Sequence, residues 1–287
     1  MSMPQLGKVG IWSMELRFGD HAVGNALAAD LDSMGFGAIW MPGGIDDGVL
    51  SDMERLLAAT QNCTIASGIL NIWKHEPADV ADWFANLSPE HQRRTMVGVG
   101  VSHGPIIGDA WEKPLAKTRA FVEAALAAGM PGTNMCVAAL GPKMLALSGE
   151  LTAGAHPYLV TPEHTKEARD ILGSGPLLAP EQGVIFGENR DDIRQTAQAG
   201  LSNYRMLPNY RNSWKRLGLS EQDIEDCSDA LIDANFASGS LDAMAERVAA
   251  HHAAGADHVC IQIVSGAMGG DMAKLRPQYE QLAGALL

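Results

Sequence analysis

The chain of 287 residues is poor in positive charge and cysteine, and it has no long apolar segment. Lys and Arg total 21 against 34 Asp and Glu, which gives a formal net charge of −13. Nucleic acids and anionic membranes bind through basic patches, so neither is expected as a partner. No apolar run approaches the roughly 20 residues of a membrane helix. The first eight residues also lack the basic and apolar regions of a secretory signal.

Several motifs that define other protein classes are missing as well. The four cysteines are far apart and form no C-x-x-C pair, so reduced thiols in a cytoplasmic protein are expected. There is no H-E-x-x-H motif and no clustered His and Asp set, which argues against a metal hydrolase. No pair of carboxylates follows the predicted strands, which argues against a glycosidase. We therefore expect a protein that binds a small-molecule substrate and no metal.

What the chain does contain is one unit, a short apolar run followed by an amphipathic helix, repeated along its length. Eight such units predict a (β/α)8 TIM barrel. A doubly wound sheet is the alternative, but the G-x-G-x-x-G that should follow its first strand is absent. The predicted strands are Val9 to Trp12, Ala38 to Met41, Thr64 to Leu70, Thr95 to Val101, Asn134 to Ala139, Ala155 to Val160, Gly183 to Phe186 and His258 to Val264.

No linker or low-complexity tract divides the sequence, so residues 1–287 are expected to form a single domain. The stretch from about 207 to 239 does not fit the repeat. It is interpreted as an insertion of helices and loops between strands seven and eight.

Functional residues in such a barrel lie at the carboxyl ends of the strands. Here these positions offer glycines, amides, small polar groups and apolar walls, a set that suits a large planar cofactor. Gly68, inside the third strand, predicts a bulge or a close approach of ligand to backbone. An ordinary core strand with a tolerated glycine is the alternative.

The segment Leu140-Gly141-Pro142-Lys143 has the properties of an anion site. Glycine lets the backbone come close, a helix start directs N–H groups outward, and Lys143 adds a positive charge. A plain helix start with a surface lysine is the alternative. Between the two histidines at strand ends, we interpret His103 as the proton carrier and His156, beside Pro157, as a structural residue.

Five segments carry a resemblance to a known family. Ala138 to Gly149 is similar to the A-A-x-G-P-x-x-L-x-L-A-G segment of the luciferase-like flavin and deazaflavin oxidoreductases, especially those that use coenzyme F420. The strand Gly98 to His103 and the segment Ala66 to Trp73, which contains the end of the third strand, resemble the corresponding strands of that family. Leu178 to Gln182 and Leu207 to Trp214 are similar to one F420-dependent subfamily.

The resemblance implies a luciferase-like TIM barrel, a homodimer, and a non-proline cis peptide at Gly68-Ile69 behind the cofactor ring. It also implies a cofactor phosphate at Leu140, Gly141, Lys143 and Met144. The remaining cofactor contacts that it implies, nearer the ring, are Asn71, Val101 and Ser102.

Two departures from the family pattern are visible. Pro42-Gly43-Gly44 follows the second strand where many members have a polar or acidic residue, so a contact there would involve the backbone. His103 stands about where the family's sugar-phosphate dehydrogenases have an acidic residue, which makes a sugar-phosphate substrate doubtful.

The function expected from these features is transfer of a hydride between F420 and a small organic substrate. An FMN-dependent monooxygenase or reductase is the close alternative. A non-catalytic barrel that has lost its cofactor is the alternative from another class.

Overall fold

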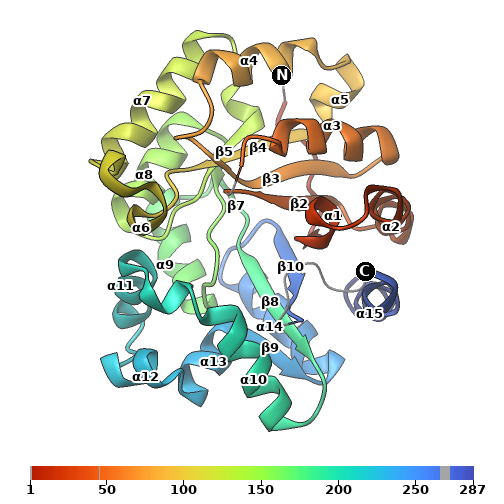
Figure 1. The fold of residues 1–287 in the computed structure, drawn as a ribbon, viewed down its shortest axis with the longest axis vertical. Coiled ribbons are helices and arrows are strands. Elements are labelled where there is room, and N and C mark those ends of the chain that lie inside the picture. Colours follow the sequence, from red (N-terminus) through yellow and green to blue (C-terminus); the bar gives the residue numbers. More distant parts are fainter. Residues whose placement is uncertain (1, 45, 266–271) are drawn as a thin grey trace.

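Ten parallel strands form one curved sheet in the computed structural model, which describes residues 2–44, 46–265 and 272–287 (Figure 1). Their order is β7-β6-β5-β4-β3-β2-β1-β10-β8-β9. The strands are β1 (Val9–Trp12), β2 (Ala38–Gly43), β3 (Thr64–Asn71), β4 (Thr95–Gly100), β5 (Met135–Val137), β6 (Gly154–Ala155), β7 (Leu177–Leu178), β8 (Glu181–Phe186), β9 (Phe236–Gly239) and β10 (Val259–Ile263).

The circle of strands closes through the segment that contains β7 and β8. At its start, the Ala179 N–H donates to the Ala155 carbonyl at 2.9 Å, on the β6 side. One residue later, the Pro180 carbonyl accepts from the Cys260 N–H at 3.0 Å, on the β10 side. Residues 177–186 therefore act as one seventh strand with a break at Pro180, and the predicted (β/α)8 barrel is confirmed.

Helices follow the strands and cover the outside of the sheet. Their sequence signals agree with this: Asp20 Oδ1 accepts from the Val23 N–H at 3.0 Å to cap α2, and Gly35 ends that helix at φ +100°. The helices are α1 (Glu15–Phe18), α2 (His21–Met34), α3 (Val49–Ala59), α4 (Pro77–Asn86), α5 (Pro89–Arg93), α6 (Gly104–Ile107), α7 (Pro114–Ala127), α8 (Pro142–Leu151), α9 (Pro162–Leu172), α10 (Arg190–Leu201), α11 (Pro208–Arg216), α12 (Glu221–Asp226), α13 (Asp229–Asn235), α14 (Leu241–Ala253) and α15 (Met272–Leu286), with short 3₁₀ turns η1 (Gly108–Ala110), η2 (Gly132–Asn134) and η3 (Tyr204–Met206).

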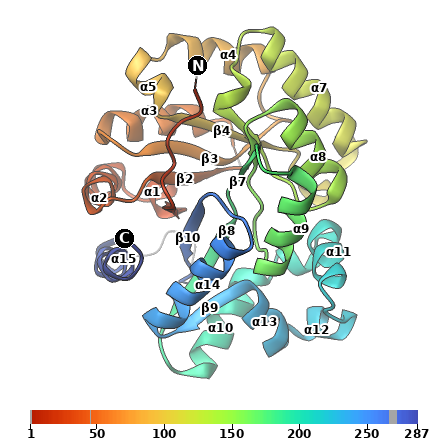
Figure 2. The same cartoon turned by 180° about the vertical axis from the view of Figure 1, so that it is seen from behind.

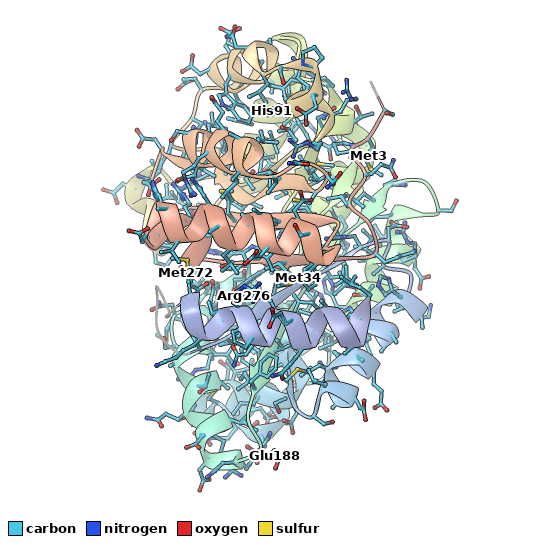
Figure 3. All side chains as sticks on the ribbon, turned by 90° about the vertical axis from the view of Figure 1, so that its right-hand side faces the viewer. Met3, Met34, His91, Glu188, Met272 and Arg276 are labelled. Carbon is cyan, nitrogen blue, oxygen red and sulfur yellow. The ribbon has the colours of Figure 1, made fainter. Side chains whose placement is uncertain are left out.

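The first and last long helices close the barrel side by side. Figure 3 shows α2 and α15 lying next to each other, with Met34, Met272 and Arg276 between or beside them. Arg276 on α15 donates to Asp30 on α2 at 2.6 Å. None of the described helices is both long enough and apolar enough to cross a membrane.

Apolar residues are divided between the inside and the outside of the sheet. The outer cluster fills the space between strands and helices and includes Ile39, Leu56 and Val97. The interior of the barrel holds a separate cluster, which consists of Leu6, Trp12, Ala38, Trp40, Ala66, Met96, Cys136, Leu177, Ala179 and Cys260. The four cysteines are buried and unpaired, as the sequence predicts.

The insertion packs on one side of the barrel, where Figure 1 shows α11, α12 and α13 together. A buried network fixes it there. Trp214 Nε1 on α11 donates to Asn235 Oδ1 at 2.9 Å, and Gln182 Nε2 on β8 donates to the Asn235 carbonyl at 3.1 Å. The Gln182 side chain also reaches His251 of α14 at 3.0 Å, and His251 reaches Thr165 of α9 at 2.8 Å.

The structure differs from the sequence-based expectation at three element boundaries. Instead of ending in loops, the insertion ends in β9, which pairs with β8 and lies beside α14 in the rear view (Figure 2). The sequence Ser51-Asp52-Met53-Glu54 has the pattern of a capping box and predicts a helix start at Ser51. Helix α3 instead begins at Val49 with Gly48 as its N-cap, and Ser51 lies within the helix and donates to the Gly48 carbonyl. The seventh strand resumes at Glu181, two residues earlier than predicted.

Candidate active site

The carboxyl ends of β3, β4 and β5 lie next to one another at one mouth of the barrel. The Ile72 N–H donates to the Gly100 carbonyl at 3.1 Å, and the Ala138 N–H donates to the Val99 carbonyl at 2.9 Å. Strand residues below this level are fully buried, whereas most of the predicted site residues here are partly exposed. The partly exposed set, which therefore faces space that solvent can reach, is Gly68, Ile69, Val101, Ser102, His103, Leu140 and Gly141.

Strand β3 has the irregularity that Gly68 predicts. Its pairing with β4 shifts register between Ala66 and Leu70, and the Gly68-Ile69 peptide is cis. The Gly68 carbonyl accepts from Trp12 Nε1 at 3.1 Å. A Cβ at Gly68 would lie 2.6 Å from Trp12 Nε1 and 2.9 Å from His156 Nε2, so only glycine fits here without rearrangement.

Asn71, predicted to stand near the cofactor ring, is fully buried and uses its amide within the protein. Its Nδ2 donates to the Gly44 carbonyl at 3.1 Å, and its Oδ1 accepts from the Trp73 N–H at 3.0 Å. Asn71 thereby ties the loop after β2 to the end of β3. Its described bonds hold the wall of the mouth in place.

His103 caps the short helix α6 at the end of β4 and is half-buried. Its ring lies 5.7 Å from the ring of Tyr210, which the insertion brings to the mouth. Burial lowers the pKa of His103 below its usual value, and a side-chain hydrogen bond with Asn209 opposes that effect. At neutral pH His103 is therefore a neutral imidazole that can accept a proton. The preceding residue, Ser102, has φ +59°, in the left-handed region.

The start of α8 has the geometry of an anion site. Gly141 is its N-cap and provides no side-chain bond, and a Cβ added there would meet nothing within 4 Å. The Met144 N–H bonds to the Gly141 carbonyl at 3.1 Å and Pro142 has no N–H, so the backbone donors without a described partner at this turn are those of Gly141 and Lys143. The Lys143 side chain is exposed and Met144 is half-buried against the core.

A second cation lies beside this turn, on a segment that sequence reasoning did not connect with it. Arg216 at the end of α11 donates to the Leu140 carbonyl at 2.8 Å, and His164 of α9 contacts the same oxygen at 2.9 Å. Arg216 and Leu140 are separated by 76 residues along the chain. No local sequence signal could have placed Arg216 near Gly141.

Aromatic rings form an arc around the mouth, from Trp12 at the end of β1, beside the bulge of β3, to His103 after β4. Trp12 and Tyr158 have ring centroids 5.5 Å apart, Tyr158 and Tyr204 5.5 Å, and Tyr204 and Tyr210 5.0 Å. His103 completes this aromatic arc beside Tyr210. Two of its rings, Tyr204 and Tyr210, come from the insertion. A set of flat apolar faces with polar edges is suited to a planar ring.

One buried carboxyl stands next to the arc. Glu181 at the start of β8 is 1% exposed, and its Oε2 accepts from the Leu159 N–H at 3.1 Å. Burial raises the pKa of Glu181 to about 8. Close by, the Tyr158 hydroxyl donates to Gln262 Oε1 at 2.7 Å. The sequence analysis did not select Glu181, Tyr158 or Gln262 as site residues.

His156 packs inside the barrel, as expected of a structural residue, although one of its ring nitrogens makes no described hydrogen bond. Its ring stacks on Trp40 with centroids 4.2 Å apart, and Nδ1 contacts the Ala179 carbonyl at 2.7 Å. Nε2 has no hydrogen-bond partner among the described residues. Burial lowers the pKa of His156 to about 4, so this ring is neutral at physiological pH.

Two cavities lie outside the arc. One of about 470 Å³ lies between the start of α9 and the insertion, with Glu163, Asp233 and Arg247 in its wall. Because Arg247 is bonded to the Asp233 and Ala234 carbonyls, this cavity has no convergent set of free groups. Another, of about 270 Å³, is lined by Trp73, Lys113 and Lys117. It adjoins the mouth, since Trp73 Nε1 donates to the Val101 carbonyl at 2.7 Å.

No protein-family model matches the sequence. Among solved structures, an F420-dependent secondary alcohol dehydrogenase in complex with an F420–acetone adduct superposes with a TM-score of 0.71 at 17% identity, over 99% of this chain and 100% of that one. The F420-dependent tetrahydromethanopterin reductase from Methanopyrus kandleri superposes with a TM-score of 0.70 at 14% identity, over 99% of each chain. The chain has the fold of these barrels.

A third structure with this fold carries a different cofactor. The oxygenating constituent of 3,6-diketocamphane monooxygenase from Pseudomonas putida, in complex with FMN, has a TM-score of 0.66 at 15% identity, over 100% of this chain and 99% of that one. The resemblance to luciferase-like oxidoreductases is thus confirmed for the fold. These structural neighbours include both F420-dependent and FMN-containing proteins.

Proposed function

We propose that the chain is an oxidoreductase that binds F420 at the mouth of the barrel and transfers a hydride between it and a small organic substrate. The observation that carries the proposal is the aromatic arc facing the ends of β3 and β4, with an open helix start at Gly141 one strand away. Together they bring a set of aromatic rings and an anion site to adjoining strand ends. Deazaflavin, when bound, supplies the hydride chemistry itself.

The residues around the mouth fit such a cofactor. Ile69 and the bulged backbone of β3 form one wall, with Val101 and Ser102 at the neighbouring strand end. The Lys143 N–H and ammonium, together with Arg216, can hold a phosphate at the start of α8. These local cations matter because the global charge of −13 opposes an anion.

The loop after β2 contributes only backbone. Gly43 and Gly44 stand there, and the Gly44 carbonyl is already bonded to Asn71. This departure from the family pattern leaves proton transfer to other strand ends. In this proposal His103, neutral and partly exposed at the end of β4, accepts the proton when an alcohol is oxidised and returns it in the reverse direction.

A titration with each cofactor tests the proposal. Purified full-length protein is titrated with F420 and, separately, with FMN, and binding is followed by the absorbance and fluorescence of the cofactor. Saturable binding of F420, with FMN weaker, is the expected result. Tighter binding of FMN would instead favour the monooxygenase or reductase alternative, for which the diketocamphane monooxygenase fold is a precedent.

The same experiment separates an enzyme from a barrel that has lost its cofactor. If neither F420 nor FMN binds, the proposed function fails. Lys143→Ala provides the internal check, because it removes a charge at the proposed phosphate site without touching the core. Lys166→Ala is its matched control, since Lys166 is an exposed lysine on α9 that pairs only with Asp170 among the interactions described.

A further inference from the structure

Glu181 has an unsatisfied oxygen next to the proposed site. Its Oε2 accepts from the Leu159 N–H, but Oε1 is buried and has no hydrogen-bond partner among the described residues. Buried polar atoms in native proteins nearly always have partners, and leaving one unpaired costs about 1–3 kcal/mol. A ligand atom that pairs with Glu181 relieves this cost, so the orphaned oxygen marks a place where a polar group of a ligand belongs.

The surroundings of Glu181 keep its carboxyl uncharged. The titratable groups that interact with it are Tyr158 after β6, Tyr204 and Tyr210 of the insertion, and Cys260 of β10. All are neutral at pH 7, because burial raises the pKa of each one. Burial likewise raises the pKa of Glu181 to about 8. A carboxylic acid held neutral in this way can donate a hydrogen bond to a ligand oxygen.

We propose that the buried Glu181 carboxyl, beside the Tyr158 ring, forms a polar subsite that takes an uncharged oxygen of the substrate, and that the substrate class is a ketone or aldehyde. The subsite deepens the proposed function and rests on it for its redox role. Tyr158 and Tyr204 interact electrostatically with Glu181 and are themselves half-buried. In this proposal the substrate reaches Glu181 past these two rings, with the Tyr204 ring turning aside. Ring rotation of this kind is common on ligand binding.

The charge of the subsite excludes anionic substrates. Among the described residues, no Lys or Arg acts on Glu181 or on the tyrosines around it. Of the cations described near the mouth, Lys143 and Arg216 stand at the start of α8, where they serve the proposed phosphate, and Lys113 and Lys117 line the cavity beside Trp73. A carboxylate or phosphate group beside Glu181 would therefore be desolvated without a counterion, at a cost that a carbonyl does not carry.

Binding of two probes of similar shape tests this subsite. The full-length protein is titrated with 4′-fluoroacetophenone, a neutral ketone, and with 4-fluorobenzoate, and binding is measured by fluorine NMR with and without saturating F420. We expect the ketone to bind about tenfold or more tightly than the benzoate near neutral pH. Affinity for the ketone should fall about tenfold as the pH rises through about 8, because the ionised Glu181 no longer donates.

Glu181→Gln removes the titration and keeps an amide donor of the same shape. Its affinity for the ketone should be independent of pH over this range. Glu188→Gln, at an exposed glutamate beyond the end of β8 (Figure 3), is the matched control and should behave as the unaltered protein. The subsite is refuted if the ketone and the benzoate bind equally, or if Glu181→Gln keeps the pH profile of the unaltered protein.

Cofactor titration of the same samples separates the two proposals. If the cofactor binds, and Glu181→Gln binds the ketone with the same pH dependence as the unaltered protein, the subsite is overturned and the proposed function stands. Ketone binding with the expected dependence on Glu181, but no binding of F420 or FMN, supports the subsite and overturns the proposed function.

Discussion

Replacing Glu181 by Gln should stabilise the folded protein, and by an amount that grows with pH. Glutamine has nearly the same shape and can still accept the hydrogen bond from the Leu159 N–H. It differs in having no proton to lose. The substitution therefore isolates the cost of keeping an ionisable group in a site that is 1% exposed.

The size of the effect follows from the two pKa values. An ordinary glutamate has a pKa of 4.5, which describes the unfolded chain, and burial raises that of folded Glu181 to about 8. Between these values the unfolded state has released the proton while the folded state retains it, so rising pH favours unfolding. At roughly 1.4 kcal/mol per pKa unit the full cost is about 5 kcal/mol, absent below pH 4.5 and complete above pH 8.

Urea unfolding of both proteins near pH 5, 7 and 9, at one protein concentration, measures this cost. The free energy of unfolding of Glu181→Gln minus that of the unaltered protein should be near zero at pH 5 and rise by several kcal/mol by pH 9. Titrations elsewhere cancel in this difference. An equal difference at all three pH values would mean that Glu181 ionises normally, and the reasoning from burial would be wrong. Glu188→Gln, at an exposed site, should show no pH-dependent difference.

Four further outcomes are expected. Lys143→Ala should weaken F420 binding about tenfold to a hundredfold in a fluorescence titration, whereas Lys166→Ala leaves it unchanged. His103→Ala should lower kcat by about 10²–10⁴ with cofactor affinity nearly intact, and full turnover would make His103 a wall residue. Gly68→Val should lower cofactor affinity, since its Cβ would lie 2.6 Å from Trp12 Nε1, and an unchanged dissociation constant would count against the site. Light scattering at micromolar concentration should give the mass of a homodimer, and a monomer would contradict the family expectation.

Most of the fold could be predicted because each unit carries its own local signals. An apolar run of buried strand residues, a capping Asp20 or Thr161, a first-turn proline and a terminal Gly35 are readable without knowledge of the neighbours. The insertion could be recognised because its sequence lacks the repeated pattern of an apolar run followed by an amphipathic helix. Its last residues form β9 because the edge of β8 is free to pair with them. This pairing depends on the tertiary structure and cannot be predicted from the local sequence.

The parts of the candidate site that are formed by the backbone could be predicted from the sequence. The parts that are formed by side chains from distant segments could not. Gly68 and Gly141 can be selected from the sequence, because a glycine inside a strand or before a helix-starting proline usually marks a backbone that bends or is closely approached. The aromatic arc joins Trp12 of β1 to Tyr204 and Tyr210 of the insertion, nearly two hundred residues apart. Its members are ordinary aromatic residues in sequence, and only packing shows that they surround one mouth.

Glu181 shows how a small boundary error changes a functional interpretation. With the seventh strand expected to begin at Gly183, Glu181 and Gln182 belong to a loop, where a charged residue is ordinary. The strand resumes at Glu181 instead, and its side chains then alternate between the two faces of the sheet. Gln182 points outward and bonds to His251 and Asn235, which fixes the insertion. Glu181 must therefore point inward, toward Tyr204 and Tyr210 of the same insertion. The two neighbouring residues thus have different roles, since Gln182 fixes the insertion to β8 and Glu181 places a carboxyl beside its tyrosines.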